Sequence, residues 1–525
     1  MSQEDMKVEH RLVETGRRNF LQVIFGRTMI VISLLLIQYL ILFSMLSKLA
    51  AYLPYFFGGV YTFTAIMLIY ILNTDNDPTI KLSWSIVIAV LPAFGALLYL
   101  YLKLDLGHRI GKQAYQDSVD ATVKYLPDQS ELMRKIDTEN TNFYGIASYL
   151  KNYGHTYICE NTEVRYLSSG EEKFAVMLEE LEKAEKYIFL EYFIIKEGYM
   201  WNTILNILVR KARQGVDVRV MYDGTNTFAN LPATYPKYLR RLGIKCKVFA
   251  PLRPFLSTHY NNRDHRKILV IDGHTAITGG VNLADEYINY IDRFGHWKDT
   301  AVMMKGEAAR NFVLMFLQLW NSRDKNADYD SFLNVPSTTS HTANGYVIPY
   351  GDSPTDNENV GEAVYLHLLN HAKDYIYITT PYLILDHDLI LALRFAAKRG
   401  VDVRVVVPSR SDHWYVTPLA KTHYHELCDA GVKVYEYTPG FIHAKMFLCD
   451  DSEAVVGTIN LDYRSLYWHF ECATYLHKVE AIQDIKTDFY DIFDKSKLIM
   501  HQDLKNISYT DKILGALFKV IAPLM

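Results

Sequence analysis

Two segments of the chain repeat one arrangement of reactive side chains. The first reads DHRKILVIDGHTAITGGVN from Asp264 to Asn282, and the second reads FIHAKMFLCDDSEAVVGTIN from Phe441 to Asn460. Both contain His-x-Lys, an aspartate five residues after the lysine, and a glycine and an asparagine at equal spacing beyond it. A single H-x-K-x-x-x-x-D pattern arises easily by chance. Two copies with the same downstream spacing are a strong signal.

The repeated residue types suit chemistry on a phosphate group. The histidine and lysine of each copy are two positions apart, so in a strand they face the same side. Lysine and asparagine can hold phosphate oxygens, and glycine lets the backbone approach closely. The two copies together would surround a single phosphate. The candidate catalytic residues are His265, Lys267, Asn282, His443, Lys445 and Asn460.

Two histidines at opposite ends of an in-line path permit a double displacement. One attacks phosphorus to give a covalent phosphohistidine, while the other protonates the departing alkoxide and later deprotonates the incoming hydroxyl. A nucleophilic imidazole works best when a carboxylate or carbonyl holds its other nitrogen. Glu471 and Asp299 lie downstream of the two asparagines, and either can serve in this way. The alternative is that each is an ordinary carboxylate at a strand edge.

The aspartates of the two motifs are expected to be structural. Asp272 and Asp450 have the opposite strand parity to the motif lysines, so they point away from the expected site. Gly273 follows the first and Asp451 follows the second, and both pairs favour hairpin turns. The predicted return strands are Thr275–Thr278 and Glu453–Val456.

Strand and helix patterns alternate around these motifs and repeat in the same order. A buried strand is predicted at Tyr187–Ile195, a helix at Met200–Gln214 and a further strand at Val216–Tyr222. The same order returns later in the chain, and GVDVRV begins at both Gly215 and Gly400. The sequence therefore predicts an α/β protein built from two copies of one layered fold.

Three apolar stretches near the N-terminus are long enough to cross a bilayer, namely Thr28–Leu46, Ala50–Leu72 and Trp84–Leu102. A cleaved signal peptide has one short apolar core, so three stretches predict retained transmembrane helices and a multi-pass protein of the cell membrane. Basic residues precede the first stretch and also follow the third, so the orientation stays open. One stretch can instead be a shallow hairpin.

The predicted organisation follows from these patterns. It comprises a basic N-terminal segment (1–27), membrane helices (28–104), a linker (105–143), a first α/β domain (144–335), a second (346–500) and an amphipathic tail (501–525). In the tail, one helical face carries Ile513, Leu517, Val520, Ile521 and Leu524. This face can either dock on the catalytic core or rest on a membrane.

Composition excludes several other classes of protein. The 525 residues carry a formal net charge of −4, which gives no general attraction to nucleic acid or anionic lipid, so any phosphate binding must come from local positive charge. The five cysteines are scattered, odd in number and without a C-x-x-C pair. This pattern indicates neither a disulfide framework nor a zinc site.

The paired motifs resemble those of the phospholipase D superfamily, and further segments resemble bacterial cardiolipin synthases. The stretch Trp84–Tyr101 is similar to the last membrane segment of that family. Asp264 stands where the family usually has asparagine, Thr458 replaces a more usual serine, and Thr28–Leu46 looks additional to the two membrane segments of the family. The matching segments are LEYFII at Leu190, NNRDHRKILVIDG at Asn261, GGVNLADEY at Gly279, ITTPYLI at Ile378, PGFIHAKMF at Pro439 and GTINLDYRSLYWHFE at Gly457.

This resemblance implies two phospholipase D-like α/β halves that form a pseudo-dimer around one site. It implies that two phosphatidylglycerol molecules give cardiolipin and glycerol, without a metal or an organic cofactor. By the same resemblance His265 is the nucleophile and His443 the acid and base. The implied partners are phosphatidylglycerol and an anionic phospholipid membrane, with no nucleic acid. The oligomeric state stays open.

Other functions share parts of this pattern. A related phospholipase D-type phosphatidyltransferase or a phospholipid hydrolase would keep the same motifs, because the motifs determine the chemistry at phosphorus and not the acceptor. A nuclease is disfavoured by the apolar stretches and by the lack of excess positive charge. A catalytically silent lipid-binding scaffold is disfavoured because both His-Lys pairs are intact.

Overall fold

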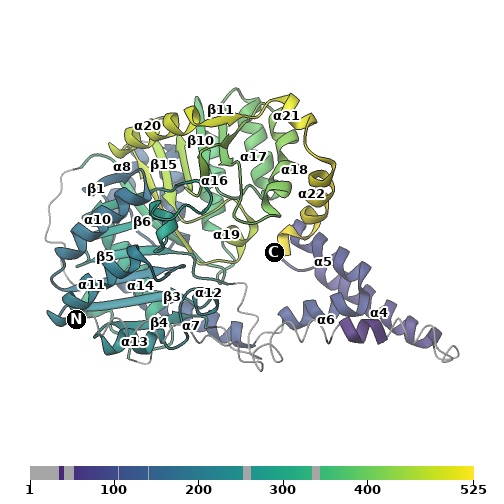
Figure 1. Cartoon of the computed structure of the whole chain (residues 1–525), viewed down its shortest axis with the longest axis horizontal. Helices are drawn as coiled ribbons and strands as arrows, with labels where there is room; N and C mark the ends of the chain where they lie inside the picture. Colours follow the sequence, from purple (N-terminus) through teal and green to yellow (C-terminus); the bar gives the residue numbers. More distant parts are fainter. Residues whose placement is uncertain are drawn as a thin grey trace. The chain divides into compact units, whose positions relative to one another are not determined.

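The computed structural model describes residues 33, 35–40, 53–103, 106–139, 141–251, 262–324, 326–333 and 343–524. The chain divides into two compact units. The larger unit contains residues 111–250 and 261–522 and holds both copies of the repeated motif. The smaller unit contains residues 1–110, 251–260 and 523–525. Figure 1 shows the strands and helices of the larger unit, coloured along the sequence.

The first copy forms a seven-stranded mixed sheet in the order β1-β8-β6-β5-β2-β3-β4, counted over the described residues. Strands β2, β3 and β4 are parallel, as βαβ connections require, and the remaining pairs are antiparallel. The strands are β1 Glu163–Leu167, β2 Tyr187–Tyr192, β3 Asp217–Asp223, β4 Lys245–Phe249, β5 Lys267–Ile271, β6 Thr275–Gly279 and β8 Ala301–Lys305. The helices are α10 Gly170–Glu182, α11 Tyr199–Arg213, α12 Asn226–Ala229, α13 Tyr235–Arg241, α14 Ala308–Asn321 and α15 Asp330–Leu333.

The second copy repeats this order in an eight-stranded sheet, β17-β12-β11-β10-β14-β15-β16-β9, again over the described residues. Its parallel strands are β10, β11 and β12. The strands are β9 Tyr346–Asp352, β10 Tyr375–Thr379, β11 Asp402–Pro408, β12 Lys433–Tyr437, β14 Met446–Cys449, β15 Glu453–Gly457, β16 Glu471–His477 and β17 Ser496–Leu498. The helices are α16 Val360–His371, α17 His387–Lys398, α18 Val416–Asp429, α19 Tyr463–Tyr467 and α20 Ala481–Asp494. The prediction of two α/β halves is therefore confirmed.

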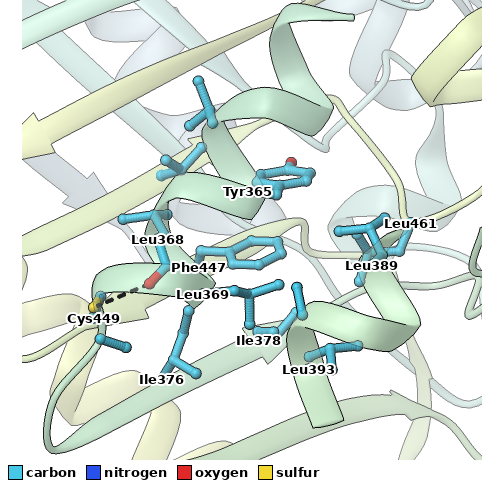
Figure 2. Packing of buried hydrophobic residues seen from close by; sticks show 14 of the residues in the cluster. Tyr365, Leu368, Leu369, Ile376, Ile378, Leu389, Leu393, Phe447, Cys449 and Leu461 are labelled. Atoms are coloured by element: carbon cyan, nitrogen blue, oxygen red, sulfur yellow. Dashed lines mark hydrogen bonds between the residues drawn. The ribbon is translucent and has the colours of Figure 1, made fainter. Parts of the chain in front are cut away.

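Each sheet is fixed by helices that bury an apolar face against it. In the second half, Tyr365 of α16 stacks on Phe447 of β14 with ring centroids 4.0 Å apart. Figure 2 shows these rings beside Ile376 and Ile378 of β10. Burial of such side chains contributes about 1.5–3 kcal/mol each, so this layer holds the strands that carry the second motif.

The motif aspartates tie their hairpins to the start of the central strand. The carboxylate of Asp272 accepts hydrogen bonds of 2.7–2.8 Å from the backbone N–H groups of residues 185–187. Asp450 accepts equivalent bonds of 2.7–2.9 Å from residues 373–375. Both aspartates have positive φ, 53° and 48°, a conformation that Asp tolerates better than most residues. Their carboxylates thus bind backbone at the start of β2 and β10.

The predicted transmembrane helices are not confirmed. The smaller unit contains α4 Leu53–Leu72, α5 Pro78–Val90 and α6 Pro92–Lys103. The predicted span Trp84–Leu102 is divided between α5 and α6, because Pro92 has no N–H to continue the hydrogen bonding of α5. Among the helices that the structure describes, none combines the length and the apolar character needed to cross a membrane. Most of Thr28–Leu46 lies outside the described residues.

The segment 105–143, expected to be a linker, is largely helical where it is described. It contains α7 Leu106–Thr122, the 3-10 helix η1 Val123–Tyr125 and α8 Ser130–Glu139, and α9 Thr141–Tyr153 follows. Met133 and Ile136 are buried in the core of the second half. The apolar spacing on α8 therefore forms a packed face rather than a free connection.

The C-terminal tail packs on the second half through one face and exposes the other. It contains α21 His501–Lys505, α22 Tyr509–Ile521 and the 3-10 helix η3 Ala522–Leu524. Helix α22 lies against α18, where Asp511 accepts a 3.0 Å hydrogen bond from Lys421. On the outer face Ile513 is 46% exposed and Leu517 is 61% exposed. The predicted apolar face therefore points away from the catalytic core.

Candidate active site

The two His-x-Lys segments lie where backbone from one half pairs with backbone from the other. The N–H of His265 donates to the carbonyl of Phe470 in the second half, at 2.9 Å. In the mirror arrangement, β13 (Gly440–Ile442) runs parallel to β7 (His296–Lys298) of the first half. The N–H of His443 then donates to the carbonyl of Lys298 at 2.7 Å. Backbone hydrogen bonds thus fix each motif histidine against the opposite half.

These backbone contacts place a carboxylate of the opposite half beside each histidine. The residue after Phe470 is Glu471, whose oxygens lie 2.8 and 2.9 Å from Nδ1 of His265. The residue after Lys298 is Asp299, whose Oδ2 lies 2.7 Å from Nδ1 of His443. All four side chains are buried. An Nδ1–H that donates to a carboxylate leaves the Nε2 lone pair of the ring free to act as a base or nucleophile.

The two imidazoles are held in the neutral form. Burial lowers the pKa of His265 well below its usual value, and the positive charges of Lys267 and Lys445 lower it further. Burial and then Lys445 lower the pKa of His443 to about 4, and Asp299 opposes this shift only in part. A neutral imidazole is the form that can attack an electrophile.

The motif lysines are buried beside their histidines and have weakened basicity. The Nζ of Lys267 donates to the carbonyl of His265, and that of Lys445 donates to the carbonyl of His443. Burial lowers the pKa of Lys267 to about 8, although Glu471 acts in the opposite direction. Burial also lowers the pKa of Lys445 to about 7, although Asp299 and Glu471 act in the opposite direction. Two cations that are poorly solvated provide a strong attraction for an anionic group.

The small residues after the return strands make room for the carboxylates. A Cβ atom at Gly280 would lie 2.0 Å from Oδ1 of Asp299, so any larger residue would displace the carboxylate that reaches His443. The equivalent position in the second half is Thr458, whose hydroxyl donates to Glu471. The departure from serine therefore keeps a hydroxyl that helps to orient this carboxylate.

The motif asparagines lie at the ends of the same loops. The Oδ1 of Asn282 accepts from the N–H of Ile194 at 3.0 Å, and its Nδ2 donates to the hydroxyl of Tyr287 at 2.8 Å. Asn460 is 4% exposed, and within the described residues its buried Oδ1 has no hydrogen-bond partner. The two asparagines are therefore in different hydrogen-bonding states.

Sequence reasoning missed two buried basic residues at this site. The ring of His469 lies 5.5 Å from that of His265, and its Nδ1 is 3.6 Å from Oε1 of Glu471. Ligand atoms of these three side chains lie within 4.8 Å of one another, a spacing that can hold a metal ion. Lys173 donates to the carbonyl of Val281 at 2.7 Å and fixes the loop before Asn282. The i, i+2 spacing of His469 and Glu471 was the available signal.

A buried ion pair lies behind the first motif. Arg266 alternates with its neighbours, so its Nε points away from the site and lies 2.6 Å from Oε1 of Glu191 on β2. Asp264 lies 3.5 Å from the same Nε and accepts a 3.3 Å bond from the backbone N–H of Arg266. The aspartate that departs from the family pattern therefore contacts this arginine.

Profiles of known families match most of the region just described. The profile described as "Cardiolipin synthase, PLD-like domain" matches residues 177–320 and 365–493, which are the two halves. The profile described as "Phospholipase_D-nuclease N-terminal" matches residues 62–103.

Individual relatives cover nearly the whole chain. A protein of Streptococcus mutans described as uncharacterized is 49% identical over 457 residues, which are 87% of this chain and 99% of that protein. The cardiolipin synthase of Alkalihalophilus pseudofirmus is 32% identical over 474 residues, or 89% of this chain and 93% of the enzyme. Cardiolipin synthase 2 of Bacillus cereus is 32% identical over 457 residues, which are 86% of this chain and 88% of that enzyme.

A solved structure shares the fold. The phosphatidylserine synthase of Haemophilus influenzae superposes with a TM-score of 0.56 at 13% identity, covering 73% of this chain and 100% of that enzyme. The fold, the paired motifs and the relatives agree, and the chain belongs to the phospholipase D-type cardiolipin synthase family of phosphatidyltransferases.

Proposed function

We propose that the protein is a cardiolipin synthase that transfers a phosphatidyl group from one phosphatidylglycerol to another and releases glycerol. The observation that carries this proposal is the exchange of carboxylates between the halves. Glu471 and Asp299 each hold Nδ1 of the histidine in the opposite half, so each ring has a free Nε2. Two such rings supply the nucleophile and the proton carrier that a double displacement needs.

In the first step, Nε2 of His265 forms a bond to the phosphorus of the first phosphatidylglycerol. The bond from phosphorus to the headgroup glycerol oxygen breaks, and His443 gives that oxygen a proton, so glycerol leaves neutral. The neutral His443 takes up this proton from solvent as the substrate binds, because the negative charge of the phosphodiester and Asp299 at 2.7 Å favour the imidazolium form. The product on the enzyme is a phosphatidyl-histidine.

In the second step, His443 is neutral and takes a proton from a hydroxyl of the second phosphatidylglycerol. The oxygen of this hydroxyl bonds to phosphorus as the bond to His265 breaks. Cardiolipin leaves, and both imidazoles return to their starting forms. Lys267 and Lys445 stabilise the phosphoryl oxygens through both steps, and Asn460 can donate an amide N–H to them.

We propose that the apolar outer face of α22 contacts the lipid surface from which the substrates come. This face carries Ile513, Leu517 and Val520, and the helix lies beside a cavity of about 620 Å³. The basic side chains lining the cavity are Lys421, His425, His501, Lys505 and Lys512. An apolar face beside basic groups is the combination that binds an anionic membrane surface.

The reaction predicts defined products. Purified full-length protein incubated with phosphatidylglycerol should give cardiolipin and glycerol in equal amounts, measured by mass spectrometry and an enzymatic glycerol assay. His265→Ala and His443→Ala should each reduce cardiolipin formation by at least about 10³-fold, because each histidine takes part in both steps. Phosphatidic acid as the sole lipid product would identify a hydrolase instead. A normal cardiolipin yield from either variant would exclude the two-histidine mechanism.

The crossed carboxylates predict a loss of turnover with little change in substrate binding. Glu471→Gln and Asp299→Asn keep the side-chain shape but remove the charge that orients and stabilises each ring, so kcat should fall by about 10²–10⁴-fold with a small change in KM. Glu480→Gln, on an exposed glutamate just after β16, is the matched control. Wild-type kcat in both site variants would show that the carboxylates have no positioning role.

The lowered lysine pKa values predict weaker anion binding at high pH. The pKa values are about 8 for Lys267 and about 7 for Lys445, so both groups are charged below this range and neutral above it. The affinity for glycerophosphoglycerol, whose phosphodiester charge is constant here, should fall as pH rises through 7 to 8. Calorimetric titration at a series of pH values measures this affinity. In Lys445→Gln only the decrease in affinity near pH 8, caused by Lys267, should remain. A pH-independent affinity would contradict this assignment.

If α22 contacts the lipid surface, substitutions on its outer face should slow turnover of substrate in vesicles but not of substrate in solution. The double variant Ile513→Ser/Leu517→Ser should slow turnover on phosphatidylglycerol vesicles several-fold. Turnover of a short-chain phosphatidylglycerol dissolved below its micelle concentration should not change, because α22 contributes no residue to the site. Tyr490→Ser, at an exposed position of α20, is the matched control. An equal loss on both substrates would indicate damage to the fold.

A further inference from the structure

A second cluster of histidine and carboxylate side chains lies in the second half, at the end of β16 opposite to Glu471. It consists of His367 and His371 of α16 and Glu453 at the start of β15. One ligand atom from each of the three residues lies within 4.8 Å of the other two. His477, the last residue of β16, pairs with Glu453 across the sheet.

The spacing of these side chains is short enough for one cation to contact all three. Residues four positions apart share one helical face, so both imidazoles of α16 point the same way, with ring centroids 4.3 Å apart. The Nδ1 of His371 donates to the backbone carbonyl of His367 at 2.7 Å, and its Nε2 is paired directly with Oε2 of Glu453, so a cation bound here would take the place of the proton between these two atoms. Metal-binding histidines almost always donate their second nitrogen in this way.

His367 and Glu453 each have a buried atom that can bind a cation. The Nε2 of His367 is buried, and within the described part of the chain it has no hydrogen-bond partner. The carboxylate of Glu453 is buried, and its second oxygen lies 3.2 Å from Nδ1 of His477. A ligating carboxylate is normally held by such an outer hydrogen bond.

The equivalent corner of the first half provides an internal comparison. There Glu180 forms ion pairs of 2.9 Å with Lys183 of the helix end and with Lys305 at the end of β8. Lysine ammonium groups neutralise a carboxylate but cannot bind a cation. In the second half imidazoles stand at this corner, and His367 supplies a further nitrogen that the ion-pair arrangement does not need.

We propose that His367, His371 and Glu453 bind a zinc-type divalent cation that clamps α16 to β15, with His477 orienting the carboxylate. Two imidazoles and one carboxylate are a common ligand set for zinc, and solvent can fill a fourth position. Glu471 and His477 lie at opposite ends of β16, which are about 20 Å apart at 3.3 Å per residue. The ion is therefore structural and takes no part in the transfer of the phosphatidyl group.

Metal content of the full-length protein tests this proposal. Detergent-purified protein, given one equivalent of Zn²⁺ and dialysed against metal-free buffer, should retain about one zinc ion per chain by mass spectrometry of the elements. His367→Gln should lower this to under about a tenth of an ion, because one of three ligands is lost. His477→Ala should weaken zinc binding by about 10- to 100-fold.

Two control variants separate this site from other histidines. His425→Ala removes an exposed histidine that pairs only with Asp429, and His469→Gln alters the three-residue cluster at the active site. Both should retain zinc at the wild-type level. Loss of zinc from His469→Gln, with retention by His367→Gln, would place the ion at the active site and overturn the proposal.

Thermal stability gives a second readout. Removal of zinc with a chelator should lower the Tm of the wild type by several degrees, since a ligand that binds only the folded state stabilises it. The Tm of His367→Gln should not respond to the chelator, and without metal it should match the wild type because Nε2 of His367 has no partner to lose. A wild-type protein that neither retains zinc nor gains stability from it would refute the site.

Discussion

The hydrogen bond between each motif histidine and a carboxylate of the opposite half is the contact on which the site depends. In each case the carboxylate comes from the half that does not carry the histidine. His265 is oriented by Glu471, and His443 by Asp299. Backbone pairing at the residue before each carboxylate fixes both contacts, so the shared interface determines the geometry of the rings. The packing between the two halves therefore also keeps each histidine within hydrogen-bond distance of its carboxylate.

Burial gives these groups their properties and also makes the empty site costly. Two lysines and two imidazoles lie in a region with little water, and burial is the main reason that the pKa of Lys445 falls to about 7. Desolvated cations repel one another, and an anionic phosphodiester relieves this repulsion. The cationic form of the site is therefore stabilised by a bound anion. Behind the first motif, Arg266 and Glu191 form a further buried pair 2.6 Å apart.

Much of the fold was predictable from the sequence, because strand periodicity and turn residues are local signals. The duplicated α/β order and the turning aspartates Asp272 and Asp450 belong to this class. Glu471 and Asp299 were identified as candidates, but their exchange between halves depends on distant packing that no local pattern encodes. The helix α8 in the expected linker was missed although its apolar spacing is a local signal, and only the packing of that face on the second half depends on distant residues. At Pro92 a local signal was given too little weight. The apolar composition of Trp84–Leu102 predicts one long helix, but the proline divides this stretch between α5 and α6.

The crossed contacts have a consequence for how such a duplicated chain changes over evolutionary time. After duplication, two copies usually drift apart freely, one keeping the old role while the other acquires a new one. Here a substitution at Asp299 alters a histidine in the other copy, and one at Glu471 does the reverse. The copies differ at Gly280 and Thr458, and each of these residues contacts the carboxylate of its own half, which in turn holds the histidine of the other half. The site is therefore complete only when the two copies pack together.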